Sequence, residues 1–287
     1  MIQSAVSMIC EGLKVLQPLA EVVPNSKCCA ILLCGGKGSR LASQGIDTHK
    51  PLMPLLGKPS LLCVIDQLFA SEIDFSSIIA VVPTDRIEQY QVATSGREIT
   101  IVGQSTALGT GDAVIQAIGS IPAEIEHVYV SFGTQPLVRN HSISLSLAHH
   151  IANNLAFTLP TTLIANPYAP LIRDENGVVC DSVETHLEGS KKVEFGEANV
   201  GGYWASIKAL REVLYPMSST RWNAKSSCYD TASGELGYPN EMVRACLAAG
   251  LGVDGLQCAE PEEMMGIKTL KNIGEIEEII LRRQHLD

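Results

Sequence analysis

The run over residues 32–52 constrains the fold of this chain more than any other segment. It reads Leu-Leu-Cys-Gly-Gly-Lys-Gly-Ser-Arg at its start and His-Lys-Pro-Leu at its end. A buried strand that runs into a glycine loop can turn successive backbone N–H groups toward one anion, and Lys37, Arg40 and Lys50 add the positive charge that phosphate oxygens need. The segment therefore predicts a phosphate-binding loop at the end of a strand.

Two common phosphate-binding loops do not match this run. A Walker A loop needs Gly-x-x-x-x-Gly-Lys-Ser/Thr, and the chain contains no such sequence. The dinucleotide fingerprint Gly-x-Gly-x-x-Gly fails because Leu41 follows Gly36 and Gly38 where the third glycine would stand. Glycine after a strand can also form only a tight turn, so the assignment depends on motifs further along the chain.

Composition limits the class of partner. The chain has 287 residues, 46% of them hydrophobic and 18% charged, which is enough for the core of one large domain or two unequal ones. A net charge of -10 with 5% aromatic residues argues against a nucleic-acid-binding surface, because such a surface needs a cationic field. We therefore expect small-molecule partners and no nucleic acid.

Nine cysteines without a Cys-x-x-Cys pair or zinc-type spacing are typical of reduced thiols in a cytoplasmic protein.

A helical extension is expected ahead of the main domain. Residues 1–24 have no basic start and no apolar run long enough to span a bilayer, so we expect neither a signal peptide nor a membrane anchor. Apolar residues fall on one helical face at Val6, Ile9, Leu13 and Leu16. The division is then an N-terminal helical extension over residues 1–27 and one domain over residues 28–287.

Strand and helix patterns alternate through the first half of that domain. Short β-branched runs predict strands over residues 29–33, 78–82, 99–102 and 128–132. Apolar periodicity predicts helices over residues 61–70 and 110–118. This rhythm is typical of a parallel sheet covered on both faces. We therefore expect an α/β fold of the Rossmann-like, three-layer kind, with a mixed, mainly parallel sheet.

The second half is expected to complete the sheet and to supply a lobe that binds a second substrate. Strands are predicted over residues 156–164, 178–183 and 198–204, and helices over residues 207–214, 240–249 and 275–283. Ligands of open α/β sheets bind at the carboxyl ends of the strands. The Gly35 loop, the turn over residues 132–137 and the segment over residues 199–202 should meet there.

Three motifs give the chain a family resemblance. They are the glycine loop over residues 33–40, Lys-Pro-Leu-Met-Pro-Leu-Leu-Gly-Lys-Pro over residues 50–59, and Gln-Ser-Thr-Ala-Leu-Gly-Thr-Gly-Asp-Ala-Val over residues 104–114. In this order and at this spacing they resemble the sugar-phosphate nucleotidyltransferases, most closely the uridylyltransferase domain that makes UDP-N-acetylglucosamine. The similarity spans residues 28–283 and implies a nucleotidyltransferase fold without that family's acetyltransferase β-helix.

The resemblance implies roles for individual residues. Arg40 and Lys50 would be the catalytic cations that stabilise the triphosphate and the leaving pyrophosphate. Gln104 would hydrogen-bond a pyrimidine edge, and Glu184 and Asn199 would face the acceptor. The other implied nucleotide-binding residues are Leu33, Cys34, Gly35, Gly36, Lys37, Gly38, Gly109, Thr110, Gly133 and Thr134.

Several of these roles have structural alternatives. Gln104 could be a solvated strand end, Thr110 an ordinary N-cap and Glu184 one of many surface carboxylates. Taken singly, Thr110 and Glu184 fit the structural alternative better. Taken with the glycine loop, Gln104, Arg40 and Lys50 fit the functional one.

The chain departs from the family at the expected magnesium site and at the acceptor site. Thr134 stands where the family has a metal-binding aspartate, and Thr231 falls at the expected asparagine ligand. A hydroxyl is a poor ligand for a hard dication, so Mg²⁺ as cofactor is left without assigned protein ligands unless Asp230 or Asp112 supplies a displaced carboxylate. In addition, Tyr-Ala-Pro over residues 168–170 replaces a Gly-Tyr-Gly segment whose backbone N–H binds the sugar, and proline has no N–H.

Two functions of different class follow. The first is transfer of a nucleotidyl group from UTP, CTP or dTTP to a sugar phosphate or similar phosphorylated acceptor, with release of pyrophosphate. The second is a catalytically silent relative that binds a nucleotide or sugar nucleotide as a sensor or scaffold. We place the enzyme first, because a scaffold has little need for both the cationic loop and Gln104.

Overall fold

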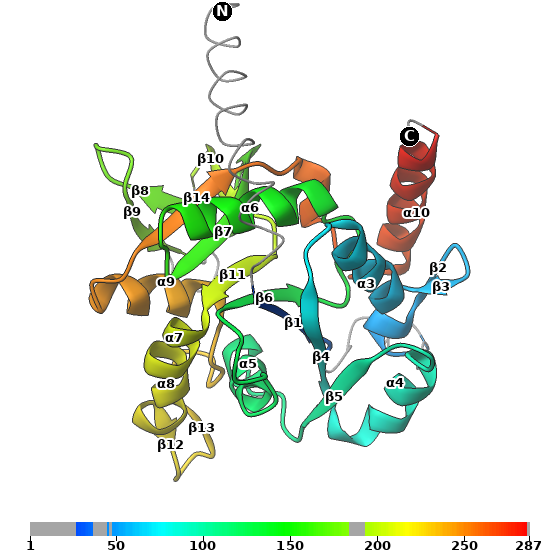
Figure 1. Ribbon diagram of the computed structural model, residues 1–287, viewed down its shortest axis with the longest axis horizontal. Helices are drawn as coiled ribbons and strands as arrows, with labels where there is room; N and C mark the ends of the chain where they lie inside the picture. Colours follow the sequence, from blue (N-terminus) through cyan, green and yellow to red (C-terminus); the bar gives the residue numbers. More distant parts are fainter. Residues whose placement is uncertain (1–26, 37–44, 46–47, 184–192, 286–287) are drawn as a thin grey trace, which may run out of the picture.

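The central element of the protein is an eight-stranded sheet, seen in a computed structural model that describes residues 27–36, 45, 48–183 and 193–285. The strand order is β10-β7-β11-β6-β1-β4-β5, with β14 also paired to β7 (Figure 1). The strands are β1 (Cys28–Leu33), β4 (Phe75–Pro83), β5 (Ile99–Gln104), β6 (His127–Phe132), β7 (Phe157–Ala165), β10 (Phe195–Asn199), β11 (Tyr203–Ser206) and β14 (Val253–Gln257). Only the pairs that β10 and β11 make are antiparallel, so the expected mixed, mainly parallel sheet is confirmed.

Helices cover both faces of this sheet. The longer ones are α3 (Ser60–Ala70), α4 (Ile87–Ala93), α5 (Thr110–Ile118), α6 (Asn140–Ala152), α8 (Tyr215–Thr220), α9 (Pro239–Ala248) and α10 (Leu270–Gln284). Shorter elements are η2 (Lys50–Leu52), η3 (Thr84–Arg86), α7 (Ile207–Ala209), the π-helix η4 (Leu210–Leu214), η5 (Pro261–Met264) and the strand pairs β2 (Pro54–Leu55) with β3 (Lys58–Pro59), β8 (Leu171–Arg173) with β9 (Val179–Ser182), and β12 (Trp222–Asn223) with β13 (Cys228–Tyr229).

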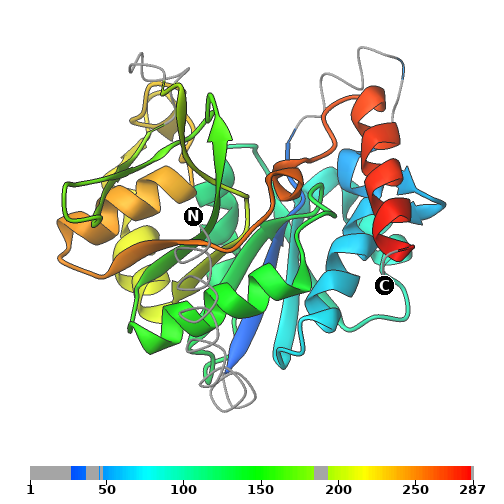
Figure 2. The ribbon, with the colours of Figure 1, turned by 90° about the horizontal axis from the view of Figure 1, so that it is seen from above.

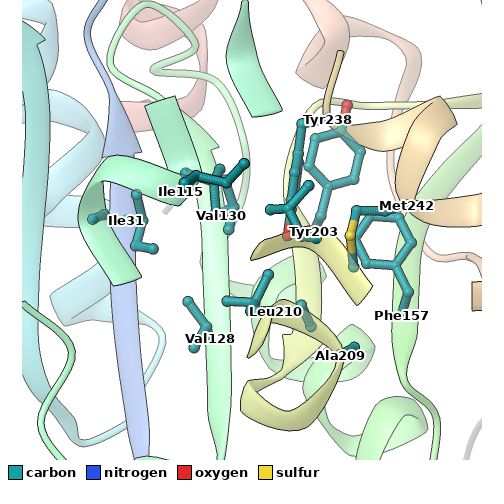
Figure 3. Close-up of a cluster of buried hydrophobic side chains, with 14 of the residues drawn as sticks. Ile31, Ile115, Val128, Val130, Phe157, Tyr203, Ala209, Leu210, Tyr238 and Met242 are labelled. Atoms are coloured by element: carbon teal, nitrogen blue, oxygen red, sulfur yellow. The ribbon is translucent and has the colours of Figure 1, made fainter. Parts of the chain in front are cut away.

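The alternating side chains of β1 divide the core in two. Ile31 and Leu33 belong to a cluster that α5, α8 and α9 cover, part of which Figure 3 shows. Ala30 and Leu32 belong to a second cluster on the opposite face, covered by α3, α4 and α6, and Figure 2 shows α3 and α6 along that side. A strand buried on both faces is expected in a parallel sheet, and it fixes the point where the glycine loop begins.

A third cluster places the C-terminal helix. Ile267 and Ile276 pack with Met53, Leu55 and Leu137, which brings the segment before α10 against β2 and the turn after β6 (Figure 1). Thr269 begins α10 as its N-cap, because its hydroxyl accepts a hydrogen bond from the Asn272 N–H. The helix therefore starts five residues before the position that periodicity predicted, at Leu270 instead of 275.

Most predicted elements of the first half are confirmed within a few residues, but the strand predicted over residues 198–204 is wrong. The chain is interrupted there between β10 and β11. Asn199 pairs with Thr161, whereas Trp204 pairs with Thr158. The chain therefore advances five residues in this segment where β7 advances three. Gly201 takes up the extra length with a φ of 98°, a conformation that glycine adopts without strain.

Other elements escaped prediction because distant residues create them. Helix α6 is polar in sequence, and its first turn is bound by the buried Glu263 carboxylate, which accepts from the Arg139 N–H at 2.9 Å and the Ser142 hydroxyl at 3.0 Å. The helix predicted over residues 207–214 is present, but only α7 at its start is α-helical, and the rest is the π-helix η4. The expected N-terminal helix lies outside the described residues.

Candidate functional site

A groove of three adjoining chambers lies at the carboxyl ends of β1 and β6. The glycine chamber, of about 610 Å³, is lined by Leu33, Gly35, Gly36, Gln104, Ala107, Gly109, Thr110, Ala113, Phe132, Ser233, Glu235 and Gly237. The central chamber, of about 510 Å³, shares Thr110, Phe132, Ser233, Glu235 and Gly237 with it. The Thr134 chamber, of about 320 Å³, is lined by Phe132, Thr134, Gln135, Tyr168, Ala169, Asn199, Val200, Gly201, Tyr203, Met264, Gly266, Ile267 and Lys268.

His49 fastens the start of the glycine loop. Its Nε2 lies 2.9 Å from the Gly36 carbonyl oxygen, and its Nδ1 lies 2.6 Å from the Tyr90 hydroxyl. Because a carbonyl only accepts, Nε2 carries the hydrogen and Nδ1 accepts from Tyr90. Burial lowers the pKa of His49, so the ring is neutral at neutral pH. The contact also holds the start of η2, where Lys50 follows His49, close to the exposed Gly35 and Gly36.

A buried carboxylate fixes the orientation of Gln104. Gln104 Nε2 donates to Asp112 Oδ2 at 2.6 Å, and the Tyr229 hydroxyl donates to Asp112 Oδ1 at 2.8 Å. A carboxylate only accepts, so the amide must turn its NH₂ group toward Asp112. Gln104 Oε1 then faces the glycine loop, where a Cβ built on Gly35 would lie 3.0 Å from it. The side chain thus presents a hydrogen-bond acceptor to the chamber.

Two glycines let a distant segment close over the start of α5. Gly109 has a φ of 102°, and a Cβ there would lie 2.3 Å from the Leu236 carbonyl oxygen. A Cβ on Gly111 would lie 2.6 Å from the Gly237 carbonyl oxygen. The Thr110 hydroxyl accepts from the Tyr238 N–H at 2.9 Å. This hydrogen bond holds the segment before Tyr238 against the start of α5, where Glu235 and Gly237 line the glycine chamber.

The Thr134 chamber is assembled from three remote segments. The turn after β6 is tied to β1 by the Gly133 N–H, which donates to the Leu33 carbonyl at 3.0 Å. The Ile267 N–H donates to the Thr134 carbonyl at 3.0 Å. Gln135 Nε2 donates to the Val200 carbonyl at 3.1 Å, which joins the turn to the segment between β10 and β11. Lys268 therefore follows a residue whose backbone is bound to Thr134.

The acceptor-side residues line the central and Thr134 chambers together. Asn199 is half-buried, and its Oδ1 accepts from the Tyr203 hydroxyl at 2.7 Å. No described residue accepts from Asn199 Nδ2, which leaves this nitrogen as the unused donor of a side chain that lines both chambers. Tyr168 is 53% exposed and forms an aromatic wall with Ala169 beside it. Pro170 pairs with Ala198 and contributes no N–H to the groove.

Most predicted site residues that the structure describes are brought together. Six of them line the glycine chamber, namely Leu33, Gly35, Gly36, Gln104, Gly109 and Thr110, while Thr134 and Asn199 line the Thr134 chamber. Cys34 and Gly133 lie beneath the groove instead, where a Cβ on Gly133 would lie 2.6 Å from Cys34 Sγ. Lys50 lines none of the three chambers. Lys37, Gly38, Arg40 and Glu184 lie outside the described residues.

The residues present do not fit a magnesium ion at the predicted position. Thr231 lines the central chamber, where its hydroxyl donates to the Glu235 carbonyl at 2.8 Å, and so does not share a chamber with Thr134. Asp112 is 4% exposed, and Gln104 and Tyr229 occupy both its oxygens. Asp230 lines none of the three chambers. Within the described part of the chain, no group of three His, Cys, Asp or Glu residues could hold a metal.

Several lining residues were missed at the level of sequence. Ser233, Glu235 and Gly237 line the glycine chamber, and the first two belong to the Ala-Ser-Gly-Glu run over residues 232–235 that follows Thr231. Lys268 had no local signal, because only the packing of Ile267 against the turn after β6 brings it to the groove.

The chain belongs to the family of MobA-like NTP transferase domains, and the match to this family covers residues 30–175. It is similar to the bifunctional protein GlmU of Clostridium tetani, with 29% identity over 258 residues that cover 89% of this chain and 52% of the relative. The bifunctional protein GlmU of Clostridioides difficile is 28% identical over 256 residues, covering 88% and 52%. The chain thus spans about half the length of these relatives.

Solved structures share the fold at low sequence identity. CMP:2-keto-3-deoxy-manno-octonic acid synthetase complexed with CTP matches with a TM-score of 0.63 and 14% identity. The match covers 90% of this chain and 100% of the synthetase chain. HddC from Yersinia pseudotuberculosis matches with a TM-score of 0.60 and 17% identity, covering 88% and 98%. These likenesses establish the nucleotidyltransferase fold. Among the described residues, no helix combines the length and apolar character that crossing a membrane requires.

Proposed function

We propose that the protein transfers a nucleotidyl group from a pyrimidine nucleoside triphosphate to a phosphorylated acceptor, with release of pyrophosphate. The observation that carries the proposal is the glycine chamber, in which the end of β1, Gln104 and the start of α5 surround one opening. Exposed backbone at Gly35 and Gly36 suits phosphate oxygens, and the Gln104 amide suits a base edge.

The orientation of Gln104 supports a base that offers a donor. Its Oε1 is the atom presented to the chamber, because Asp112 holds the NH₂ group. Uracil and thymine offer a ring N–H and cytosine offers an amino group, so each can donate to this oxygen. Glu235, which lines the same chamber, could accept from ribose hydroxyls through its carboxylate. The likeness to a synthetase crystallised with CTP is consistent with a pyrimidine.

The acceptor would lie in the central and Thr134 chambers. Asn199, which lines both chambers, would donate to it through Nδ2, and Glu184 remains the second proposed contact. The Tyr168 ring offers a flat apolar wall on which a sugar or similar ring can stack. An oxygen of the acceptor phosphate would attack the α-phosphorus as the α–β bridging bond breaks and its electron pair leaves with pyrophosphate. Arg40 and Lys50 stay the proposed cations for that leaving group.

Calorimetry with UTP, CTP, dTTP and ATP tests the nucleotide half of this proposal. We expect binding of at least one pyrimidine nucleotide, and Gln104→Ala should weaken it by about 1.4 kcal/mol, or tenfold. Gln91→Ala is the matched control, because Gln91 is exposed on α4, away from the groove. A preference for ATP, or an equal response of both variants, would contradict the proposed base site.

A catalytically silent nucleotide-binding protein is the second candidate. The observation that favours it is the Thr134 chamber, whose described lining residues include no carboxylate to hold a metal. Pyrophosphate release from the bound triphosphate with a panel of sugar phosphates separates the two. Release with any acceptor supports the enzyme, whereas tight binding without release across the panel supports the silent protein.

A further inference from the structure

We propose that Lys268 is a catalytic residue whose ammonium group takes the position of a metal ion beside the reacting phosphate in the Thr134 chamber. The inference rests on the proposed function and adds to it the source of the positive charge. The family resemblance implies a metal next to the residue at position 134, and the structure brings a lysine to the chamber that this residue lines.

The fold holds the backbone on both sides of Lys268. The Ile267 N–H donates to the Thr134 carbonyl at 3.0 Å, and the Ile267 side chain is 2% exposed within the third core cluster. On the other side, Thr269 is the N-cap of α10. A residue between a buried anchor and a helix cap has a fixed backbone position, so the start of the Lys268 side chain is held at the wall of the chamber.

The charges of the chamber select an anion. Lys268 is its only Lys, Arg, Asp or Glu among the described lining residues. It forms no ion pair with any residue that the structure describes, whereas Lys271, one turn further on, pairs with Glu275. An ammonium that has no carboxylate partner among the described residues, in a hollow that Thr134 and Asn199 also line, attracts a phosphate and opposes a second cation.

The reaction needs no proton from this lysine. An acceptor phosphate oxygen forms the new bond to the α-phosphorus, the α–β bridging bond breaks, and its electron pair departs on pyrophosphate. Lys268 keeps its three hydrogens and donates them to non-bridging oxygens, where charge gathers in the transition state. The Thr134 hydroxyl adds a neutral donor.

Calorimetry and pyrophosphate release in EDTA and in Mg²⁺ test the inference, with UTP and CTP as probes. In EDTA the unmodified protein should bind its nucleotide within about threefold of the affinity measured in Mg²⁺. Lys268→Gln should weaken binding in EDTA by about tenfold or more, the loss expected for one charge-assisted contact. Lys268→Arg should retain the affinity, and Lys271→Gln, which removes the same charge outside the groove, should leave it unchanged.

A double variant tests the exchange of lysine for metal directly. Thr134→Asp with Lys268→Asn supplies a carboxylate and an amide oxygen, the ligands that Mg²⁺ prefers, and removes the competing ammonium. Mg²⁺ should then tighten nucleotide binding by about tenfold, while it has little effect on the unmodified protein. Lys268 is exposed, so we expect all four variants to fold, and their thermal unfolding is checked first.

The outcomes separate the inference from the function on which it rests. If the unmodified protein binds nucleotide only in Mg²⁺, or if Lys268→Gln binds as well as Lys271→Gln, the lysine is not the cation, although the nucleotide site stands. If no nucleotide binds under either condition, the proposed function fails and this inference with it.

Discussion

The glycine chamber and the Thr134 chamber adjoin, yet they are built in different ways. In the glycine chamber, backbone atoms lie almost in contact, as at Gly109 and Leu236, and the side-chain polar groups bind one another, as Gln104 binds Asp112. In the Thr134 chamber the tightest glycine contacts are instead with a side chain, because a Cβ on Gly201 would lie 2.1 Å from Gln135 Oε1 and one on Gly266 would lie 3.1 Å from Gln135 Cγ. The wall of this chamber also carries Lys268, which forms no ion pair with any residue that the structure describes. The glycine chamber, where the nucleotide would bind, is therefore shaped by backbone atoms. The Thr134 chamber, where the reaction would take place, is shaped by side chains, which substitution can exchange.

Gly109→Ala should have the largest effect, because the added methyl group would clash with backbone atoms of the glycine chamber. The new Cβ would lie 2.3 Å from a backbone oxygen and the φ of 102° is strained for alanine. We expect the free energy of unfolding to fall by about 3 kcal/mol and nucleotide binding to be lost. Urea unfolding and calorimetry measure both. Gly119→Ala at the other end of α5, where a Cβ meets nothing within 4 Å, should change neither.

Asp112→Asn should come second, because it frees the Gln104 amide to turn over. Loss of hydrogen bonds to a buried carboxylate should lower the free energy of unfolding by about 2 kcal/mol. A turned Gln104 would present its NH₂ group and favour bases that offer an acceptor, so the ranking of nucleotides by affinity should change. Asp74→Asn, at an exposed position, is the control. An unchanged ranking would mean that Asp112 does not set base preference.

Gly266→Ala should cost less than Gly109→Ala, because the nearest neighbour of Gly266 in the Thr134 chamber is a side chain and not backbone. The added Cβ would lie 3.1 Å from Gln135 Cγ and 3.2 Å from the Thr134 carbonyl oxygen, and the glutamine side chain can yield. We expect a loss of about 1 kcal/mol in the free energy of unfolding. Gly274→Ala within α10 meets nothing and should instead stabilise by about 0.5 kcal/mol. A cost for Gly266→Ala equal to that of Gly109→Ala would remove the contrast.

Mild acid should weaken nucleotide binding slightly through His49. Because burial lowers its pKa below 6.5, the unfolded chain binds this proton more readily than the folded protein does. The stability that neutral His49 contributes is present above pH 6.5 and is lost as the pH falls toward the folded pKa. Protonation of Nδ1 removes the acceptor for Tyr90. Between pH 7.5 and 5.5 we expect about a threefold loss of affinity beyond that of His49→Gln, which lacks the titrating ring.

The fold was largely predictable because its first half obeys local rules. β1, β4, β5, β6, α3 and α5 were predicted from β-branched runs and apolar periodicity, which local sequence carries. The glycine chamber followed from the same logic, since the ends of parallel strands meet at one edge. Helix α6 and the interruption before β11 were not predictable, because Glu263 and the β7 register act from far along the chain.

By itself the sequence determined the class of fold and six of the residues that line the glycine chamber, because those depend on short motifs and on where strands end. It could not decide which residue stands beside Thr134. The family resemblance indicated Thr231, whereas tertiary packing places that residue in the central chamber and brings Lys268 to the chamber that Thr134 lines. The physical reason is that Ile267 must bury its side chain against Leu137, and that contact joins segments 130 residues apart.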